Sequence, residues 1–309
     1  MAVHIASGVS AVQFAPLLLA VAAATAVTPA AAEVGESVMP SAKGPKIAVK
    51  SFKAIEYESP KGGKLLYRLL TPVAAEPGRK YPLVLYLHGA GGRGSDNTRQ
   101  LTDADFCPKL LNKANFLGRY PCYLIAPQVP HRKRWVEVHW GLREHTMPAD
   151  PNEHMRMALE VVDAALSQYP VDPNRVYVTG PSMGGFGTWD AIQRRPGFFA
   201  AAIPVCGGGD AAQAPKLAKM PIWVWHGDSD RSVPTSRSRD MVAAIRAAGG
   251  KPLYTEAPNC GHRVWPQVYG SAQVWDWLFA QRLGKPEVKP TGDLPKVTTR
   301  TGDPRPAEK

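Results

Sequence analysis

The sequence predicts an α/β fold, in which a mostly parallel sheet is covered by helices on both faces. Short runs rich in apolar and β-branched residues alternate with longer segments of helical periodicity along the chain. Several of these runs are apolar at nearly every position, as a strand buried on both faces requires. This alternation is typical of parallel sheets, whose functional sites lie at the carboxyl ends of the strands.

About eight strands are expected. Residues 47–57 and 64–71 are joined by Lys61-Gly62-Gly63. Their alternating pattern and Gly-Gly turn predict an antiparallel hairpin at an edge of the sheet. The remaining predicted strands are residues 81–87, 122–126, 176–179, 200–206, 222–226 and 253–257.

Helical segments follow most of these strands. We expect Asp150 to be an N-cap residue, with Pro151 at the first helical position and Glu153 as its partner carboxylate. The apolar residues that follow share one helix face, as ordinary core packing requires. They are Met155, Ala158, Leu159, Val162, Ala165, Leu166 and Tyr169. The later helices expected are one that ends before Pro196, one over residues 236–248 that ends at Gly249, and one over residues 271–283.

The two ends of the chain differ from this body. Residues 14–27 are apolar and Ala-rich, and the small residues at 30–32 suit signal peptidase. The apolar run is too short and too interrupted by prolines to form a stable membrane span. We therefore expect a secreted or periplasmic protein, with a disordered cytosolic leader as the alternative. The expected organisation is a signal peptide over 1–32, a linker over 33–46, one globular domain over 47–283 and a disordered polar tail over 284–309.

The chain is basic but shows no nucleic-acid signature. Its 37 Lys and Arg against 26 Asp and Glu give a formal net charge of +11. These basic residues are scattered, and only residues 132–134 form a run of three. We therefore expect no nucleic-acid partner, but a mildly basic protein that tolerates anionic polysaccharide.

Four cysteines leave two alternatives open. An oxidising compartment would allow disulfides between Cys107 and Cys122 and between Cys206 and Cys260, whereas the other alternative is four buried thiols. No C-x-x-C motif and no His/Cys cluster of zinc spacing occurs, so we expect no metal.

The strand at 176–179 runs into Gly180-Pro181-Ser182-Met183-Gly184, the pattern G-x-S-x-G between a strand and a helix. Glycines at both ends let the two backbones approach closely. Ser182 is then exposed at the apex of the turn as a candidate nucleophile. The alternative is a Gly-rich turn without chemistry.

A second Gly-rich loop, residues 88–94, follows the buried strand at 81–87. Its backbone N–H groups can hold a phosphate or an oxyanion, but Walker A spacing is absent. We expect the N–H groups of Ala90 and Met183 to form an oxyanion hole, with Gly91 beside the substrate.

Four loops with chemically suggestive residues meet at the carboxyl ends of the strands: 88–94, 180–184, 226–234 and 259–262. A serine hydroxyl is a poor nucleophile near neutral pH and needs a base. His262 can supply the base, and Asp230 can fix the tautomer of its imidazole. Among the remaining polar groups, we expect Asp228 to form a turn, and His88 and His226 to stabilise loop starts.

With these motifs, residues 47–283 resemble the α/β-hydrolase superfamily, in particular its dienelactone-hydrolase-like, feruloyl/acetylxylan-esterase-like and phospholipase/carboxylesterase-like members. The resemblance rests on the chain order Ser182, Asp230, His262 and on the motifs at 87–92, 180–184, 226–230 and 261–262. In this family the acid follows His-Gly by three residues, which implies Asp230 rather than Asp228. Pro181 departs from the usual Leu, Phe or His. The resemblance implies an α/β-hydrolase fold and no cofactor.

Three tryptophans are candidate substrate contacts, each with a packing alternative. Trp135 and Trp140 belong to an irregular, basic loop and either wall a substrate cleft or pack beneath the loop. Trp265, three residues after His262, either lines an acyl pocket or packs in the core.

The expected function is that of a secreted serine esterase that uses Ser182, His262 and Asp230. The candidate substrates are acetyl and feruloyl esters of polysaccharide. A prolyl-oligopeptidase-like peptidase is an alternative, disfavoured because no propeller-sized segment precedes the domain. A carbohydrate-binding or interaction protein that kept the fold without catalysis is another. The oligomeric state is not indicated by any pattern.

Overall fold

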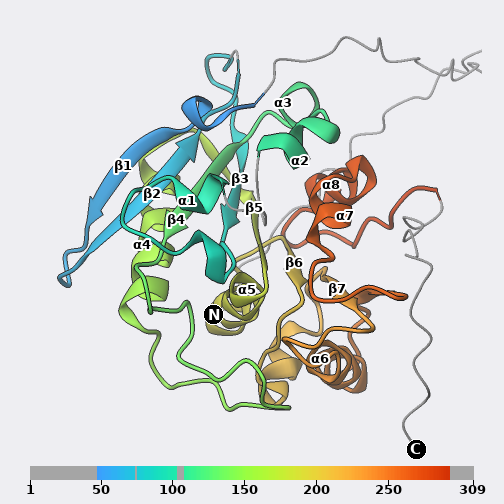
Figure 1. The fold of residues 1–309 in the computed structure, drawn as a ribbon. Coiled ribbons are helices and arrows are strands. Elements are labelled where there is room, and N and C mark those ends of the chain that lie inside the picture. Colours follow the sequence, from blue (N-terminus) through green and yellow to red (C-terminus); the bar gives the residue numbers. More distant parts are fainter. Residues whose placement is uncertain (1–46, 74, 103–107, 293–309) are drawn as a thin grey trace, which may run out of the picture. The chain divides into compact units, whose positions relative to one another are not determined.

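The computed structural model describes residues 47–292 except 74 and 103–107, so the expected signal peptide and the whole of the expected linker lie outside it. Its centre is an eight-stranded sheet of order β1-β2-β4-β3-β5-β6-β7-β8 (Figure 1). The strands are β1 (Lys53–Glu58), β2 (Lys64–Leu70), β3 (Tyr81–Tyr86), β4 (Tyr123–Gln128), β5 (Val171–Pro181), β6 (Ala201–Val205), β7 (Trp223–Gly227) and β8 (Leu253–Ala257).

Strand direction follows the predicted pattern. The hairpin of β1 and β2 is antiparallel, and β2 also pairs with β4 in antiparallel register. All later pairs are parallel, including β3 with β5, where Leu83 lies opposite Val176. Every residue of β3 and β4 is buried, which explains their unbroken apolar runs. The α/β-hydrolase fold expected from the sequence is confirmed.

Helices cover both faces of the sheet. One core cluster packs α4 (Glu153–Gln168), α5 (Met183–Arg194) and α6 (Ser236–Ala247) against one face. A second packs the other helices against the opposite face. These are α1 (Arg99–Thr102), α2 (Pro108–Lys113), α3 (Phe116–Arg119), α7 (Trp265–Tyr269) and α8 (Ala272–Ala280). The sequence predicts only α8 of this second set. The other four helices have four to six residues each, and helices this short show no periodicity. Three 3₁₀ turns complete the elements: η1 (Val49–Ser51), η2 (Ala90–Gly92) and η3 (Ala211–Leu217).

The N-cap of α4 is Asn152, not Asp150 as expected. The Asn152 side chain accepts a hydrogen bond from Met155 N at 2.9 Å. Asn and Asp are equally good caps, so local sequence does not choose between them. The Asn152 amide also donates to Arg134 O at 2.9 Å, and this long-range bond fixes where the helix begins.

Residues 284–292 differ from the expectation of a disordered tail. Gln281 is fully buried, and its side chain donates to Val288 O at 2.8 Å and accepts from Val288 N at 3.0 Å. Gln273 Nε2 donates to Thr291 O at 2.6 Å. A polar segment without periodicity is therefore held by side-chain-to-backbone bonds, whereas residues 293–309 lie outside the described part of the chain.

Three of the four cysteines are described, and all three are free thiols. The expected disulfide between Cys206 and Cys260 is wrong, because each sulfur has another partner. Cys206 Sγ–H donates to His262 O at 3.3 Å, and Gln267 Nε2–H donates to Cys260 Sγ at 3.3 Å. Cys122 is buried, while Cys107, its proposed partner, lies outside the described residues.

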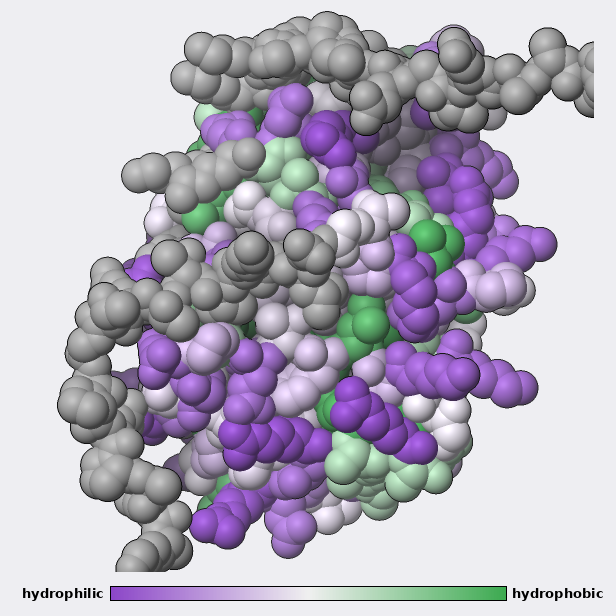
Figure 2. Space-filling model, turned by 90° about the vertical axis from the view of Figure 1, so that its right-hand side faces the viewer, coloured by the Kyte–Doolittle hydropathy of each residue, from purple (hydrophilic) through white to green (hydrophobic). Residues whose placement is uncertain are grey.

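The surface is dominated by polar side chains. On the face drawn in Figure 2, apolar residues occur as separate small patches between hydrophilic ones. Within the described ranges, the exposed large hydrophobic residues are Val73, Leu142 and Val288, which are far apart in sequence. No helix in the described ranges combines the length and apolarity that crossing a membrane would take.

Candidate active site

Ser182 occupies a strained turn between β5 and α5. Its φ and ψ are 55° and −118°, a conformation that residues with a side chain rarely adopt. The surrounding structure fixes this geometry, because Ser182 N donates to Val205 O of the neighbouring strand at 2.8 Å. The sequence-predicted nucleophile thus lies at a sharp strand-to-helix turn at the carboxyl end of the sheet.

Two glycines make this turn sterically possible. A Cβ on Gly180 would lie 2.3 Å from Leu87 O, and a Cβ on Gly184 only 1.7 Å from the same atom. Any side chain at either position would clash with backbone, which cannot move aside cheaply. The start of α5 is therefore packed against the end of β3, and the two Gly-rich loops of the sequence are neighbours.

The structure brings together the three residues expected to form a triad. Ser182 Oγ lies 2.8 Å from His262 Nε2, and His262 Nδ1 lies 2.6 Å from Asp230 Oδ2. A carboxylate only accepts, so Nδ1 carries a hydrogen and Nε2 is free to accept from the serine hydroxyl. The Asp230 side chain is fully buried, while that of His262 is 21% exposed.

Asp230 is held by four N–H donors. Its Oδ1 accepts from Ser232 N at 2.8 Å and Val233 N at 3.0 Å. Its Oδ2 accepts from His262 and also from His226 Nε2, at 3.1 Å. Burial alone would raise the pKa of Asp230, but the hydrogen bonds from His226 and His262 outweigh it and bring the pKa well below its usual range. Asp230 is therefore ionised throughout the neutral range.

Asp228 forms a turn, as expected. Its carboxylate accepts from Asn259 N at 2.9 Å and from Ser229 Oγ at 2.8 Å, and the residue is exposed. It joins the loop after β7 to the loop that carries His262. The prediction that Asp230, rather than Asp228, contacts the His262 imidazole therefore agrees with where the two carboxylates lie.

Two helical N-termini lie where the oxyanion hole was expected. Ala90 begins η2 and Met183 begins α5, and the first N–H groups of a helix have no partner within it. The contact of Gly184 with Leu87 and His88 backbone places these two helix starts beside each other. Gly91 follows Ala90 and is exposed.

The chain is similar to several proteins of known structure or sequence. Residues 151–214, which contain Ser182, match the Prolyl oligopeptidase family. The solved structure of a thermostable esterase has a TM-score of 0.69 at 36% identity, over 76% of this chain and 64% of the esterase. The poly(3-hydroxyalkanoate) depolymerase C of Paucimonas lemoignei is 26% identical, over 52% of this chain and 43% of the depolymerase.

The chain has the α/β-hydrolase fold. A puromycin-hydrolyzing peptidase of Mycobacterium tuberculosis shares this fold, with a TM-score of 0.58 at 19% identity over 80% of this chain and 41% of the peptidase. The chain thus spans less than two thirds of the length of each of these relatives.

In this α/β-hydrolase the three candidate tryptophans have different surroundings. Trp135 is fully buried, and its Nε1–H donates to His88 O at 2.9 Å. Of its two alternatives, the structure therefore supports packing beneath the loop. Trp265 is also buried, and its ring lies edge-on to the His262 imidazole at 5.3 Å. Trp140 is half-buried beside the Arg134 guanidinium, 4.7 Å from its ring centroid. Of the three, Trp140 is the one with substantial exposure.

His88 stabilises the start of the first Gly-rich loop, as expected. Val129 N–H donates to its Nε2 at 3.0 Å, so Nδ1 carries the hydrogen and donates to Gly89 O at 2.6 Å. Complete burial lowers the pKa of His88 to about 4. The neutral ring is thus a structural part of the site.

One cluster of the hydrolase has the residue types of a metal site. Ligand atoms of Cys206, His226 and Asp230 lie within 4.8 Å of one another. Burial raises the pKa of the Cys206 thiol far above neutrality, with the Asp230 charge adding to the effect, and a protonated thiol is a poor ligand. Asp230 Oδ2 already accepts two N–H bonds. These atoms therefore form a hydrogen-bonded network rather than a set of free ligands.

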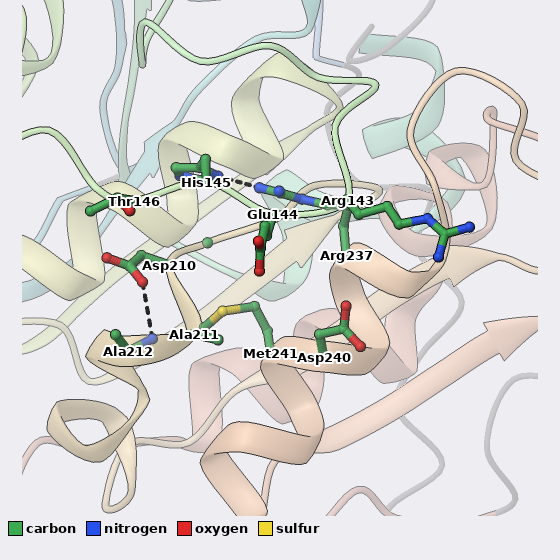
Figure 3. A pocket seen from close by; sticks show the side chains of 11 residues that line it. Arg143, Glu144, His145, Thr146, Asp210, Ala211, Ala212, Arg237, Asp240 and Met241 are labelled. Atoms are coloured by element: carbon green, nitrogen blue, oxygen red, sulfur yellow. Dashed lines mark hydrogen bonds between the residues drawn. The ribbon is translucent and has the colours of Figure 1, made fainter.

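A cavity of about 540 Å³ lies beside α5. Figure 3 shows the Arg237 guanidinium meeting His145 at its top, with Glu144, Asp210 and Asp240 around it. Arg237 lies 5.2 Å from the Phe186 ring centroid, and Phe186 N donates to Ser182 O at 3.1 Å. One lining residue of the cavity, Arg237, therefore contacts Phe186, which lies one turn of α5 after Ser182.

Proposed function

We propose that this α/β-hydrolase is a serine esterase that cleaves carboxylic esters through an acyl-enzyme. The observation that carries the proposal is the continuous hydrogen-bonded line from Ser182 Oγ through His262 to Asp230 Oδ2. Ser182 is the nucleophile, His262 the general base and acid, and Asp230 the carboxylate that orients the imidazole.

In the first half-reaction, Ser182 Oγ attacks the ester carbonyl carbon while its proton passes to His262 Nε2. The carbonyl oxygen gains negative charge and is bound by the N–H groups of Ala90 and Met183. When the C–O bond to the leaving alcohol breaks, His262 returns the proton to that alcohol. The acyl group stays on Ser182.

In the second half-reaction, water attacks the acyl carbon and gives its proton to His262. The bond to Ser182 Oγ then breaks, His262 reprotonates the serine, and the acid leaves. Asp230 remains ionised and stabilises the imidazolium in both steps, because buried N–H donors hold its charge.

The esterase named above supports ester rather than amide chemistry, because it combines 36% identity with a TM-score of 0.69. A peptidase is the second candidate, supported by the match of residues 151–214 to the Prolyl oligopeptidase family. A p-nitrophenyl ester and the p-nitroanilide of the same acyl group separate the two. We expect a much higher kcat/KM for the ester, and a preference for a prolyl anilide would favour the peptidase.

The decisive experiment compares wild type, Ser182→Ala and Ser167→Ala on p-nitrophenyl acetate. Ser167 is exposed on α4, where its hydroxyl donates to Asp163 O, so it is a matched control. We expect Ser182→Ala to lose at least about 10³-fold in kcat and Ser167→Ala to retain wild-type activity. Equal hydrolysis by all three proteins would contradict Ser182 as the nucleophile, and hydrolysis by none of them would favour a binding-only protein.

The cavity beside α5 supports a hydroxyl-rich group in the substrate, as in an ester of polysaccharide. Its lining offers guanidinium donors at Arg143 and Arg237 and carboxylate acceptors at Glu144 and Asp240. Hydroxyl groups both donate and accept, so they match such a mixed lining better than a long acyl chain does. Among the described residues that line it there is no Trp, Tyr or Phe, which favours an acetylated sugar over a feruloyl group at this position.

Asp240→Ala tests the sugar proposal, with Arg246→Ala on the exposed side of the same helix as control. We expect Asp240→Ala to raise KM for acetylated xylo-oligosaccharide several-fold while kinetics on p-nitrophenyl acetate stay unchanged. An unchanged KM for the oligosaccharide would remove this cavity from substrate binding.

Export is part of the proposal, and it rests on residues 1–32 alone. Expression of the full chain in a bacterium with a periplasm, followed by N-terminal sequencing, tests it. We expect the exported protein to begin near Glu33. A cytosolic protein that keeps Met1 or Ala2 would contradict export.

A further inference from the structure

A second imidazole contacts the triad carboxylate. His226, near the carboxyl end of β7, is fully buried, and its Nε2 lies 3.1 Å from Asp230 Oδ2. The same oxygen lies 2.6 Å from His262 Nδ1. The expectation that His226 merely stabilises a loop start therefore missed its contact with the triad. Its position at the end of a buried strand, four residues before Asp230, was the signal in the sequence that could have indicated this contact.

The surroundings of His226 fix which nitrogen carries hydrogen. Nε2 faces two acceptors, Asp230 Oδ2 and Val233 O, each at 3.1 Å, and neither can donate to it. Nε2 must therefore be an N–H donor. Nδ1 lies 2.7 Å from Ser238 Oγ, and the same hydroxyl lies 3.2 Å from Gly207 O, so its one hydrogen points to Nδ1 or to Gly207 O. His226 is thus oriented at both ends of its ring.

We propose that His226 is a positioning residue, which holds the Asp230 carboxylate in place and limits how strongly that carboxylate stabilises a proton on His262. The proposal rests on the proposed function of the triad. Its basis is that two N–H donors share one carboxylate oxygen, so each reduces the charge available to the other. Without His226, Asp230 Oδ2 would accept a hydrogen bond from His262 alone.

Two titratable groups on the neighbouring strands lie near this pair. The Cys206 thiol, at the end of β6, is kept protonated by burial. Glu256 on β8 is electrostatically coupled to His226, but it is paired with Arg239 of α6, whose Nε lies 2.8 Å from Glu256 Oε2. The His226 donor, by contrast, contacts the same carboxylate oxygen that accepts from His262.

Removing the His226 donor should shift the pKa of His262 in a predictable direction. A carboxylate that has lost one hydrogen bond stabilises the neighbouring imidazolium more strongly, so the pKa of His262 should rise. The acid limb of the pH–rate profile, which reports His262 losing its proton, should then move to higher pH. A residue that only fills space would not move this limb.

The test compares His226→Leu with His226→Gln, whose amide N–H can stand where Nε2–H stands. Arg246→Ala, on the exposed side of α6, is the control. We expect His226→Leu to lower kcat about tenfold or more at unchanged KM and to move the acid limb upward by about half a pH unit or more. His226→Gln should have a kcat and an acid limb close to those of wild type. Equal losses in His226→Leu and His226→Gln, or an unmoved acid limb, would overturn the proposal.

A second measurement does not depend on ester hydrolysis. NMR of ¹⁵N-labelled histidine gives the pKa of His262 directly, with His262→Gln to assign its signal. We expect a higher value in His226→Leu and a near-wild-type value in His226→Gln, whether or not any ester is cleaved. If His226→Leu does not fold, His226→Asn serves, because its shorter amide reaches the Nδ1 rather than the Nε2 position. An identical His262 pKa in His226→Asn and wild type would overturn the proposal.

Discussion

The Cα of Gly184 packs so closely on the carbonyl oxygen of Leu87 that a Cβ at residue 184 would lie 1.7 Å from it. This contact joins the start of α5 to the end of β3. It therefore holds the nucleophile turn and the first Gly-rich loop in one rigid arrangement.

Gly184→Ala should be severely destabilising, because the clash is with backbone. We expect a loss of about 3 kcal/mol or more in the free energy of unfolding, measured by urea denaturation. Gly141→Ala is the control, since its Cβ would meet only the movable ring of His139, at 3.3 Å. Wild-type stability in Gly184→Ala would mean that β3 and α5 are farther apart than described here.

Asp230→Asn should remove most of the activity while leaving the fold intact. An amide in place of the carboxylate cannot stabilise the His262 imidazolium, and we expect kcat on p-nitrophenyl acetate to fall about 10³- to 10⁴-fold. Asp228→Asn, two residues away and exposed, is the matched control and should stay within about threefold of wild type. If both variants lost activity equally, Asp230 would have no special role.

The buried His88 should make stability depend on pH. Its pKa is about 4 in the folded chain and about 6.5 in the unfolded chain, so the unfolded chain binds the proton first as the pH falls. Stability from this group is therefore complete above pH 6.5 and is lost progressively towards pH 4, by up to about 3 kcal/mol. Urea denaturation of wild type and His88→Gln should give curves that differ in slope across this window. Parallel curves would contradict a neutral buried His88.

The thiols of Cys206 and Cys260 should be free. Alkylation under denaturing conditions without a reductant, followed by mass spectrometry, should modify both cysteines. In the native protein we expect Cys260, which is half-buried, to react before the fully buried Cys206. Recovery of a peptide linked through residues 206 and 260 would restore the disulfide alternative.

Much of the fold could be predicted because its signals are local. The unbroken apolar run of β3 and the Gly-Pro-Ser-Met-Gly turn are each read from fewer than ten residues. The short helices and the cap of α4 could not, since the choice of Asn152 over Asp150 depends on a bond to Arg134, 18 residues away. Trp135 was equally ambiguous, because a tryptophan in a loop looks the same whether it is exposed or buried.

For the candidate site, sequence alone determined which residue types follow which strands, and hence Ser182, Asp230 and His262 as one group. Only the tertiary structure decided how a single oxygen of Asp230 is shared between two imidazoles and that Cys206 donates to a backbone carbonyl instead of forming a disulfide. The physical reason is the separation along the chain over which each interaction acts. Turn chemistry and periodicity act between neighbours in the chain, whereas hydrogen-bond partners and burial depend on segments that meet only when the sheet has formed.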